Sequence, residues 1–298
     1  MEYMKSNYTI LDMQRVYDVL KRGIEFPKKS ALITFDDGYK DNFTNAYPIL
    51  IKHKIPAIFF LTSGNIDERE LFWWDILRYA IKKIYAATKM NDIILDIGGK
   101  KTFSVRNLVH MENYLKEVPS STRKAAIAKL IDDYSVDIQS ELVEEQLLTW
   151  QEIREMADGG MDFGSHTVDH SILTRMPLEE AQWQISKSKE KIEEEIGKEI
   201  FSFAYPNGTP KDYNLEISDY LRRRGFIAAF ATRPILYSTG NDAMTIGRIG
   251  VPDDENLFSA LISGFPGDIG RISSLPYRYF QNEYVNNENS RFFQLISQ

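Results

Sequence analysis

The sequence predicts an α/β barrel. Two apolar segments, 30–35 and 56–64, are separated by a helix-length connection, which is typical of a parallel β-α-β unit. The alternation of apolar strand and amphipathic helix resumes between residues 161 and 252. The chain has 298 residues, a length that a single such barrel commonly uses. We therefore expect functional side chains at the carboxyl ends of the strands, where a barrel gathers its functional loops.

The elements of the first half follow from hydrophobic spacing. Residues 8–23 have helical spacing and end at Gly23, a usual helix stop. The expected elements after Gly23 are a strand at 30–35, a helix at 41–54 and a strand at 56–64. Beyond them the pattern changes, so we expect residues 67–148 to form an insertion. Its expected elements are an aromatic-rich helix at 69–89, a hairpin at 92–105 that turns at Gly98 and Gly99, and a helix at 121–136.

Regular alternation returns after the insertion. The expected elements are helices at 148–160, 178–197 and 214–225 and strands at 161–166, 200–208, 226–232 and 244–252. The aromatic segment 264–298 shows no clear period, so we expect an irregular tail. The whole pattern predicts one catalytic domain over residues 1–298 that contains the insertion at 67–148.

Composition excludes several classes of function. Hydrophobic residues make up 43% of the chain and charged residues 27%, as in globular proteins, and the net charge of -7 argues against nucleic-acid binding. The absence of cysteine excludes disulfides, thiolate zinc sites and cysteine nucleophiles. We find no signal peptide and no apolar run long enough for a membrane span. The chain as given is expected in the cytoplasm, or outside it if a leader has been removed, and no pattern predicts its oligomeric state.

Two adjacent carboxylates, Asp36 and Asp37, follow the first apolar strand. At the end of a buried strand such charges repel each other unless a cation or a proton compensates them. His166 and His170 follow another strand and lie four residues apart. A helical turn there would place both imidazoles on one face, able to bind one metal ion. One carboxylate and two imidazoles leave coordination positions open, as in catalytic rather than structural metal sites.

Each of these motifs has a simpler interpretation when it is taken alone. Two histidines four residues apart are more often a surface pair, and Asp-Asp-Gly is most often a turn. Their joint occurrence at the ends of apolar strands favours a metal site, because a barrel brings those ends together.

The stretches TFDDG, HTVDH and FAYPNG resemble, in this order, the first three motifs of the NodB-type polysaccharide deacetylases, carbohydrate esterase family 4. The similarity runs from about Ile10 to Pro252. It implies a distorted (β/α) barrel that removes acetyl groups from N-acetylated sugars with a divalent metal ion, usually zinc. The chain before the first helix is short for this family, which leaves open an incomplete barrel.

The resemblance also implies roles for the residues of these motifs. By position, Asp37, His166 and His170 would bind the metal ion and Asp36 would be the general base. Such an ion lowers the pKa of water towards roughly 7 and polarises a carbonyl group. The two adjacent carboxylates then have different tasks, since one binds the ion and the other accepts a proton.

The third motif departs from the family pattern. The family commonly has an arginine, which pairs with the base, at the position of Ala204, and an aromatic residue at the position of Asn207. Asn207 can still offer its backbone N–H to a developing oxyanion, and we expect Tyr205 and Pro206 beside it to contact the substrate. Arg248, at the end of a predicted strand, is the candidate replacement for the arginine. An ordinary surface arginine is an equally good interpretation of that residue.

Other residues of the family pattern have no clear counterpart. No histidine follows His170, although family members usually supply a histidine near the C-terminus as general acid. His53 and His110 lie in a predicted helix and in the insertion, where we expect structural or solvent-exposed roles. Trp73 and Trp74 could stack on sugar rings, although anchoring of the insertion helix explains at least one of them better.

These observations predict a metal-dependent deacetylase that acts on N-acetylhexosamine units of a polysaccharide or glycan precursor. One alternative is an amidohydrolase with the same ion and base that acts on another small amide. A second is a glycan-binding module that has lost turnover. Activity on chitooligosaccharides compared with small amides separates the first alternative, and binding without acetate release identifies the second. An aspartyl-phosphate enzyme built on FDDG leaves both histidines unexplained.

Overall fold

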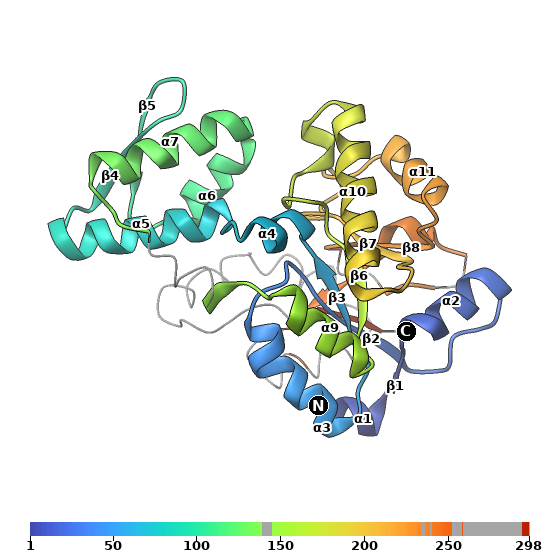
Figure 1. Cartoon of the computed structure of the whole chain (residues 1–298). Helices are drawn as coiled ribbons and strands as arrows, with labels where there is room; N and C mark the ends of the chain where they lie inside the picture. The colour runs from blue at the N-terminus through green and yellow to red at the C-terminus, as the bar shows by residue number, and fades with distance from the viewer. Residues whose placement is uncertain (139–144, 234–235, 239, 252–257, 259–293, 298) are drawn as a thin grey trace. The chain divides into compact units, whose positions relative to one another are not determined.

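The computed structural model describes residues 1–138, 145–233, 236–238, 240–251, 258 and 294–297. The chain forms two compact units, and Figure 1 traces both along the chain. Unit 1 comprises Met1–Glu68 and Leu147–Gln298, and unit 2 comprises Arg69–Gln146. Within the described part of the chain, no helix combines the length and the apolar character needed to cross a membrane.

Unit 1 is built on a curled sheet with seven parallel strands, which confirms the predicted α/β fold of barrel type. These strands are β1 (Thr9–Ile10), β2 (Ser30–Phe35), β3 (Ile58–Leu61), β6 (Asp162–Ser165), β7 (Ser202–Ala204), β8 (Ala228–Ala231) and β9 (Ile246–Gly247). From β2 to β9 they pair in chain order. Every residue of β2, β3, β7 and β8 is buried, as expected for parallel strands that are covered on both faces.

The first strand corrects one prediction. Residues 9–10, at the start of the helix expected at 8–23, form β1 and pair with Ser30 and Ala31 of β2. The helix α2 itself covers Met13–Arg22 and ends at Gly23 in the left-handed conformation, as the sequence predicts. The chain therefore has a strand before its first barrel helix, which helical periodicity had concealed.

The two ends of the sheet meet at one segment of chain. β9 pairs with β8, whereas β10 (Ile249–Gly250) pairs with β11 (Gln294–Ser297), which runs antiparallel to β2. Only Arg248 separates β9 from β10 in the sequence. The first and the last strand in the order of the sheet, β10 and β9, therefore belong to one short segment of chain. The strand β11 corrects the prediction of an irregular tail over 264–298. Hydrophobic spacing did not reveal this strand, because four residues are too few to show a period. The rest of that tail lies outside the described residues.

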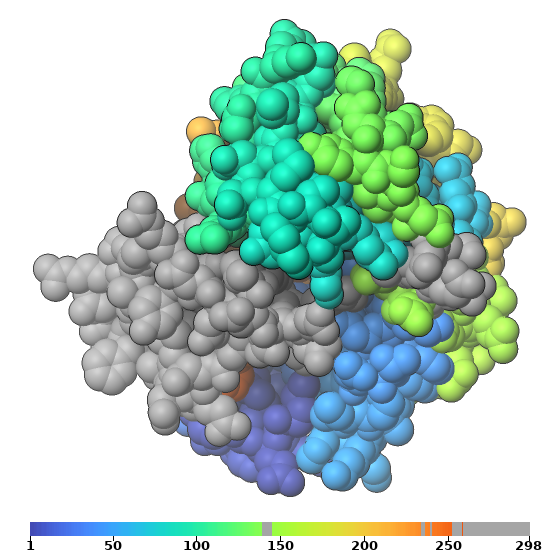
Figure 2. Space-filling view, turned by 90° about the vertical axis from the view of Figure 1, so that its left-hand side faces the viewer, coloured from blue at the N-terminus to red at the C-terminus, as the bar shows by residue number. Residues whose placement is uncertain are grey.

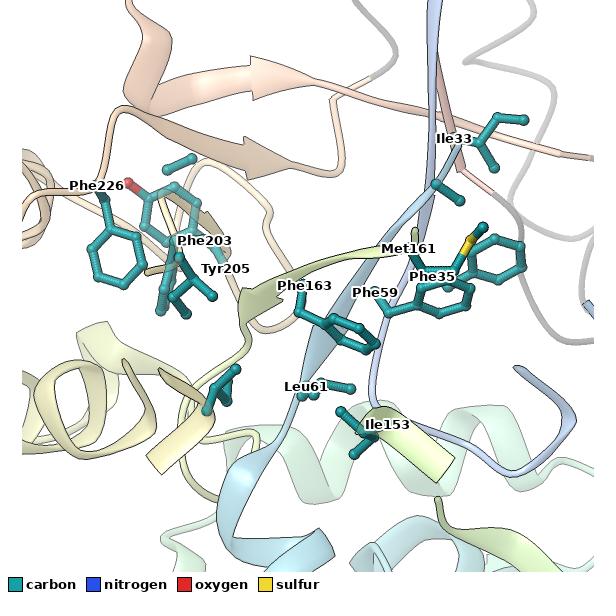
Figure 3. Packing of buried hydrophobic residues seen from close by; sticks show 14 of the residues in the cluster. Ile33, Phe35, Phe59, Leu61, Ile153, Met161, Phe163, Phe203, Tyr205 and Phe226 are labelled. Atoms are coloured by element: carbon teal, nitrogen blue, oxygen red, sulfur yellow. The ribbon is translucent and has the colours of Figure 1, made fainter. Parts of the chain in front are cut away.

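The outer face of the sheet packs against helices. These are α3 (Tyr47–His53), α9 (Trp150–Asp158), α10 (Leu178–Ile196) and α11 (Leu215–Arg223). Figure 3 shows part of this core, in which Phe35, Phe59 and Phe163 from three neighbouring strands lie together. The rings of Phe35 and Phe59 stack with centroids 4.6 Å apart.

The inner face has its own small core. Phe60 of β3 and Phe230 of β8 have ring centroids 5.3 Å apart, although two strands separate β3 from β8 in the sheet. Only strong curvature brings them together, so this face is concave. Met13 and Val16 of α2 pack into the same cluster.

Helix ends follow local signals in the sequence. Asp12 caps α2 by accepting a hydrogen bond from the Arg15 backbone, and Gly197 ends α10 in the left-handed conformation. Thr149 and Glu152 form a capping box at the start of α9. The helix expected at 41–54 begins as a π-helical turn over 42–46 before α3.

In its described residues, unit 2 has its own hydrophobic core, formed by a hairpin and three helices. Its elements are α5 (Trp73–Thr88), β4 (Asp92–Asp96), β5 (Lys100–Ser104), α6 (Leu108–Glu117) and α7 (Ser120–Asp133). The hairpin turns at Gly98 and Gly99, both with positive φ, as predicted. The guanidinium of Arg78 donates two hydrogen bonds to the Glu112 carboxylate inside this unit. Figure 2 shows a face of the molecule on which side chains of unit 2, coloured teal to green, are exposed.

Candidate active site

The residues singled out in the sequence follow neighbouring strands of unit 1. Asp36 and Asp37 follow β2, and His166 follows β6. The strand β3 lies between β2 and β6 and pairs with both in parallel. Carboxyl ends of parallel strands share one edge of the sheet, so the curled sheet brings these side chains to one place.

Asp37, His166 and His170 converge. The Nε2 atoms of both histidines lie 3.4 Å from Oδ1 of Asp37. The three potential ligand atoms all lie within 4.8 Å of one another. Oδ1 of Asp37 is buried and has no hydrogen-bond partner of ordinary geometry among the described residues. A buried carboxylate oxygen in this state needs a cation or a proton to offset its charge.

A turn, and not a helix, places the two imidazoles together. The helical geometry considered for residues 166–170 is absent, and Thr167 and His170 have φ values of 69° and 59°. Asp37 has a φ of 74°. Left-handed backbone costs non-glycine residues roughly 1–2 kcal/mol each, so it persists only where surrounding contacts fix it.

A backbone carbonyl orients His166. Its Nδ1 lies 2.7 Å from the carbonyl oxygen of Ala204. A carbonyl oxygen can only accept, so Nδ1 carries the hydrogen and the lone pair of neutral His166 is on Nε2, which faces Asp37. Burial lowers the pKa of His166, but the carboxylates of Asp36 and Asp37 outweigh it and raise that pKa. Sequence reasoning missed this role of Ala204, because a backbone carbonyl leaves no signal in a residue type.

Arg248 binds Asp36 through two hydrogen bonds. Its Nη1 and Nη2 atoms donate to Oδ1 and Oδ2 of Asp36, each at 2.7 Å, and the residue is only 2% exposed. The interpretation of Arg248 as a surface arginine is therefore wrong. Burial opposes ionisation of Asp36, but the guanidinium of Arg248, with help from His166 and His170, holds the pKa of Asp36 below its usual value. The carboxylate next to the three converging groups is thus kept ionised.

The third motif, FAYPNG, contacts His166 through the backbone carbonyl of Ala204. Tyr205 is fully buried, stacks on Tyr213 and donates its hydroxyl to the Met244 carbonyl, so its side chain lies in the core. The expected contact of Tyr205 with substrate stays a prediction. Pro206 is buried, and Asn207 is half-buried with a φ of 59°. The proposed use of the Asn207 N–H as an oxyanion donor stays a prediction.

Four other residues named from the sequence lie in α3 of unit 1 or in unit 2. His53 is the last residue of α3. His110 is the third residue of α6 in unit 2, where its ring centroid lies 6.3 Å from that of Phe103. Trp73 and Trp74 are half-buried in unit 2: Trp74 stacks on Phe72 and Trp73 packs under a guanidinium group. Their contact with a glycan stays a prediction.

The three converging residues fit a divalent metal ion. A tetrahedral ion with ligand bonds of about 2.0–2.1 Å needs ligand atoms about 3.3 Å apart. The two distances from Asp37 to the imidazoles are 3.4 Å, and all three ligand atoms lie within 4.8 Å of one another. The buried Oδ1 of Asp37 and the oriented Nε2 of His166 are a carboxylate oxygen and an imidazole nitrogen, which are both common ligands of divalent metal ions. Asp36 lies beside these residues, and both of its carboxylate oxygens accept hydrogen bonds from Arg248.

The chain belongs to the polysaccharide deacetylase family, whose profile matches residues 23–227. Poly-β-1,6-N-acetyl-D-glucosamine N-deacetylase of Staphylococcus aureus is 41% identical over 66 residues, which cover 22% of this chain and 22% of that enzyme. The Bacillus subtilis protein YxkH, named for the same family, is 21% identical over 224 residues, 75% of this chain and 52% of that protein. The match to the staphylococcal relatives therefore spans about a fifth of their length.

Solved structures agree with the fold. The deacetylase PplD of Streptococcus pyogenes, solved with acetate, superposes with a TM-score of 0.57 at 19% identity over 87% of this chain and 83% of that chain. IcaB from Ammonifex degensii gives a TM-score of 0.53 at 21% identity over 87% and 84%. Both have the curled α/β architecture of unit 1, which is what similarity at this level of identity shows.

Proposed function

We propose that this chain is a metal-dependent deacetylase that removes acetyl groups from N-acetylhexosamine units of a polysaccharide or glycan precursor. The observation that carries the proposal is the convergence of Asp37, His166 and His170 beside an ionised Asp36. The name of the staphylococcal relative suggests oligomers of β-1,6-linked N-acetylglucosamine as the first substrate to test.

Asp37, His166 and His170 would hold the ion, and zinc suits their donor atoms best. A divalent ion there supplies Lewis-acid chemistry, because it lowers the pKa of water and polarises a carbonyl group. The hydrogen bond from His166 to the Ala204 carbonyl keeps the lone pair of that histidine directed at the site.

The remaining residues of the site would move protons and stabilise charge. Asp36 would accept a proton from the attacking water, since its carboxylate lies 4.0 Å from Nε2 of His166 and is held ionised by Arg248. The backbone N–H of Asn207 would donate to the oxyanion that develops on the amide carbonyl. Asp36 could then return its proton to the leaving amine, so that one residue serves as base and acid in turn.

The test combines metal content with acetate release. The purified protein is expected to contain or take up one divalent ion and to release acetate from N-acetylglucosamine oligomers with β-1,6 or β-1,4 linkages. Acetate release from small amides alone would identify the amidohydrolase alternative. Oligomer binding without acetate release from the metal-loaded protein would identify a glycan-binding module.

Replacing Arg248 with methionine is expected to move the acid limb of the rate profile to higher pH. Arg248 holds the pKa of Asp36 below its usual value, so its removal raises that pKa. The base is then ionised only at higher pH, and activity is lost earlier as the pH falls. The measurement is kcat/KM against pH for the parent and the Arg248→Met variant.

Two variants control this experiment. Arg248→Lys keeps a cation near Asp36 and is expected to shift the limb less than Arg248→Met. Arg22→Met removes an arginine whose side chain is 64% exposed and is expected to leave the limb in place. An unchanged acid limb in folded, metal-loaded Arg248→Met would show that Arg248 does not set the ionisation of the base.

The double variant His53→Ala, His110→Ala is expected to stay active with an unchanged alkaline limb. His53 ends the surface helix α3 and His110 lies in α6, and neither belongs to the group of described residues that could hold a metal ion. A histidine that acted as general acid, with a pKa near roughly 6.5, would make activity decline as it deprotonates. If the double variant is folded and metal-loaded but inactive, one of these two histidines is the acid and the dual role of Asp36 is wrong.

A further inference from the structure

Four residues that directly follow β3 lie between the two turns that carry the candidate metal ligands. Thr62, Ser63, Gly64 and Asn65, called here the bridging segment, contain none of these ligands. Thr62, Ser63 and Asn65 are 0%, 2% and 6% exposed. The last three begin the short helix α4 (Ser63–Glu68).

The first residue of the bridging segment binds the turn that holds Asp37. The hydroxyl of Thr62 donates to the backbone carbonyl of Asp37 at 2.7 Å, and the Thr62 N–H lies 3.5 Å from the same oxygen. Asp37 is in the left-handed conformation, with a φ of 74°. The Thr62 hydroxyl therefore fixes a strained residue whose side chain is a candidate ligand.

The next three residues bind the turn between His166 and His170. The N–H of Ser63 donates to the Thr167 carbonyl at 3.3 Å, and the N–H groups of Gly64 and Asn65 donate to the Val168 carbonyl at 2.7 and 3.4 Å. The approach is close, because a Cβ on Gly64 would lie 2.5 Å from Cγ1 of Val168 and 3.0 Å from its carbonyl oxygen. Glycine is therefore required at position 64 for this contact.

The bridging segment connects the two ligand-bearing turns by hydrogen bonds. They follow β2 and β6, which do not pair with each other and are separated by β3. Gln184 of α10 also supports the histidine turn, since its Oε1 accepts from the N–H groups of Val168 and Asp169 at 2.8 and 3.4 Å. Within the described part of the chain, the hydrogen bonds of Gln184 reach the histidine turn alone, whereas the bridging segment binds both turns.

We propose that the bridging segment is a positioning element that sets the separation between the Asp37 carboxylate and the imidazoles of His166 and His170, with the Thr62 hydroxyl and Gly64 as its decisive groups. This inference rests on the proposed metal site. According to this inference, residues that bind neither the ion nor the substrate determine the positions of the three ligand side chains. Groups behind metal ligands commonly change metal affinity when they are replaced.

The test compares two substitutions of Thr62. Thr62→Val keeps the shape of the side chain but removes the donor, so zinc affinity is expected to fall about 10- to 100-fold. Thr62→Ser restores the donor and is expected to bind zinc like the parent. Affinity is measured against a competing chelator, and the visible absorption of the cobalt-loaded proteins reports the ligand geometry. Thermal unfolding of the metal-free proteins shows whether each variant folds.

A second pair of variants examines the other half of the segment. Gly64→Ala should also weaken zinc binding, because its Cβ pushes against Val168. Adding Val168→Ala should recover part of the affinity, since it removes the atom 2.5 Å away. Ser202→Ala is the control for loss of a buried hydroxyl. Ser202 is 0% exposed, and its Oγ has no hydrogen-bond partner in the part of the chain that the structure describes, so zinc affinity should not change.

The outcomes separate this inference from the proposed function. If the parent binds zinc and releases acetate, while Thr62→Val and Gly64→Ala bind zinc with parental affinity and cobalt spectrum, the bridging segment has no positioning role and the function stands. Equal losses in Thr62→Val and Thr62→Ser would also overturn the role of the hydroxyl. If the parent binds no divalent ion, the proposed metal site fails and this inference fails with it.

Discussion

Replacing His170 or His166 with alanine is expected to abolish metal retention and, with it, acetate release. Among the described residues, three donors converge within 4.8 Å, and removal of one leaves two of them, which is too few for tight binding. Replacing a residue behind a ligand costs about 10- to 100-fold in affinity, so loss of a ligand should exceed about 100-fold. The measurement is the zinc dissociation constant, together with the metal content after dialysis.

His170→Ala is the cleaner of these two variants. The His170 side chain is 12% exposed, whereas that of His166 is 2% exposed and holds a hydrogen bond to the Ala204 carbonyl, so His166→Ala also leaves a cavity. His110→Ala, in unit 2, is the matched histidine control and should retain the parental metal content. If His170→Ala binds zinc as the parent does, the assignment of His170 as a ligand is wrong.

Exchanging the two adjacent aspartates for asparagine is expected to separate binding from turnover. Asp36→Asn should keep the metal and reduce turnover by about 10²- to 10⁴-fold, the usual contribution of a positioned general base. Asp37→Asn should lose the metal, because the amide carries no charge to bind a divalent ion. Metal content and kcat are measured for both variants on the same N-acetylglucosamine oligomer.

The two substitutions control each other. They are identical in chemistry and adjacent in sequence, and the side chains are 19% and 20% exposed. The two variants are expected to differ because the contacts of the two side chains differ. Asp36 is bound by Arg248, whereas Asp37 faces the two imidazoles. Asp36→Asn leaves the buried Arg248 without its anion, so folding must be checked. Equal metal loss in both variants would remove the distinction between base and ligand.

Much of the fold could be predicted because its signals are local. The apolar runs of β2 and β3, the stop of α2 at Gly23 and the glycine turn of the hairpin in unit 2 each depend on a few consecutive residues. Errors arose where an element was too short to show a period. The strands β1 and β11, of two and four residues, are defined by their pairing with β2 and not by their own sequence.

For the candidate site too, local features could be predicted from the sequence, whereas contacts between distant segments could not. The sequence alone determined that Asp36, Asp37, His166 and His170 follow apolar strands, because residue type and position after a strand are both visible in it. It also fixed the family through its motifs. It left undecided whether Arg248 lies on the surface or beside the base.

Tertiary structure decided the contacts between distant segments. Arg248 meets Asp36 across 212 residues of sequence, at the point where the curled sheet returns on itself. The carbonyl of Ala204 orients His166, and Thr62 binds the turn of Asp37. Tyr205 lies in the core although its motif suggested a substrate contact. Backbone carbonyl and N–H groups are common to nearly all residue types, so their partners depend on sheet curvature and strand order, which only the folded chain defines.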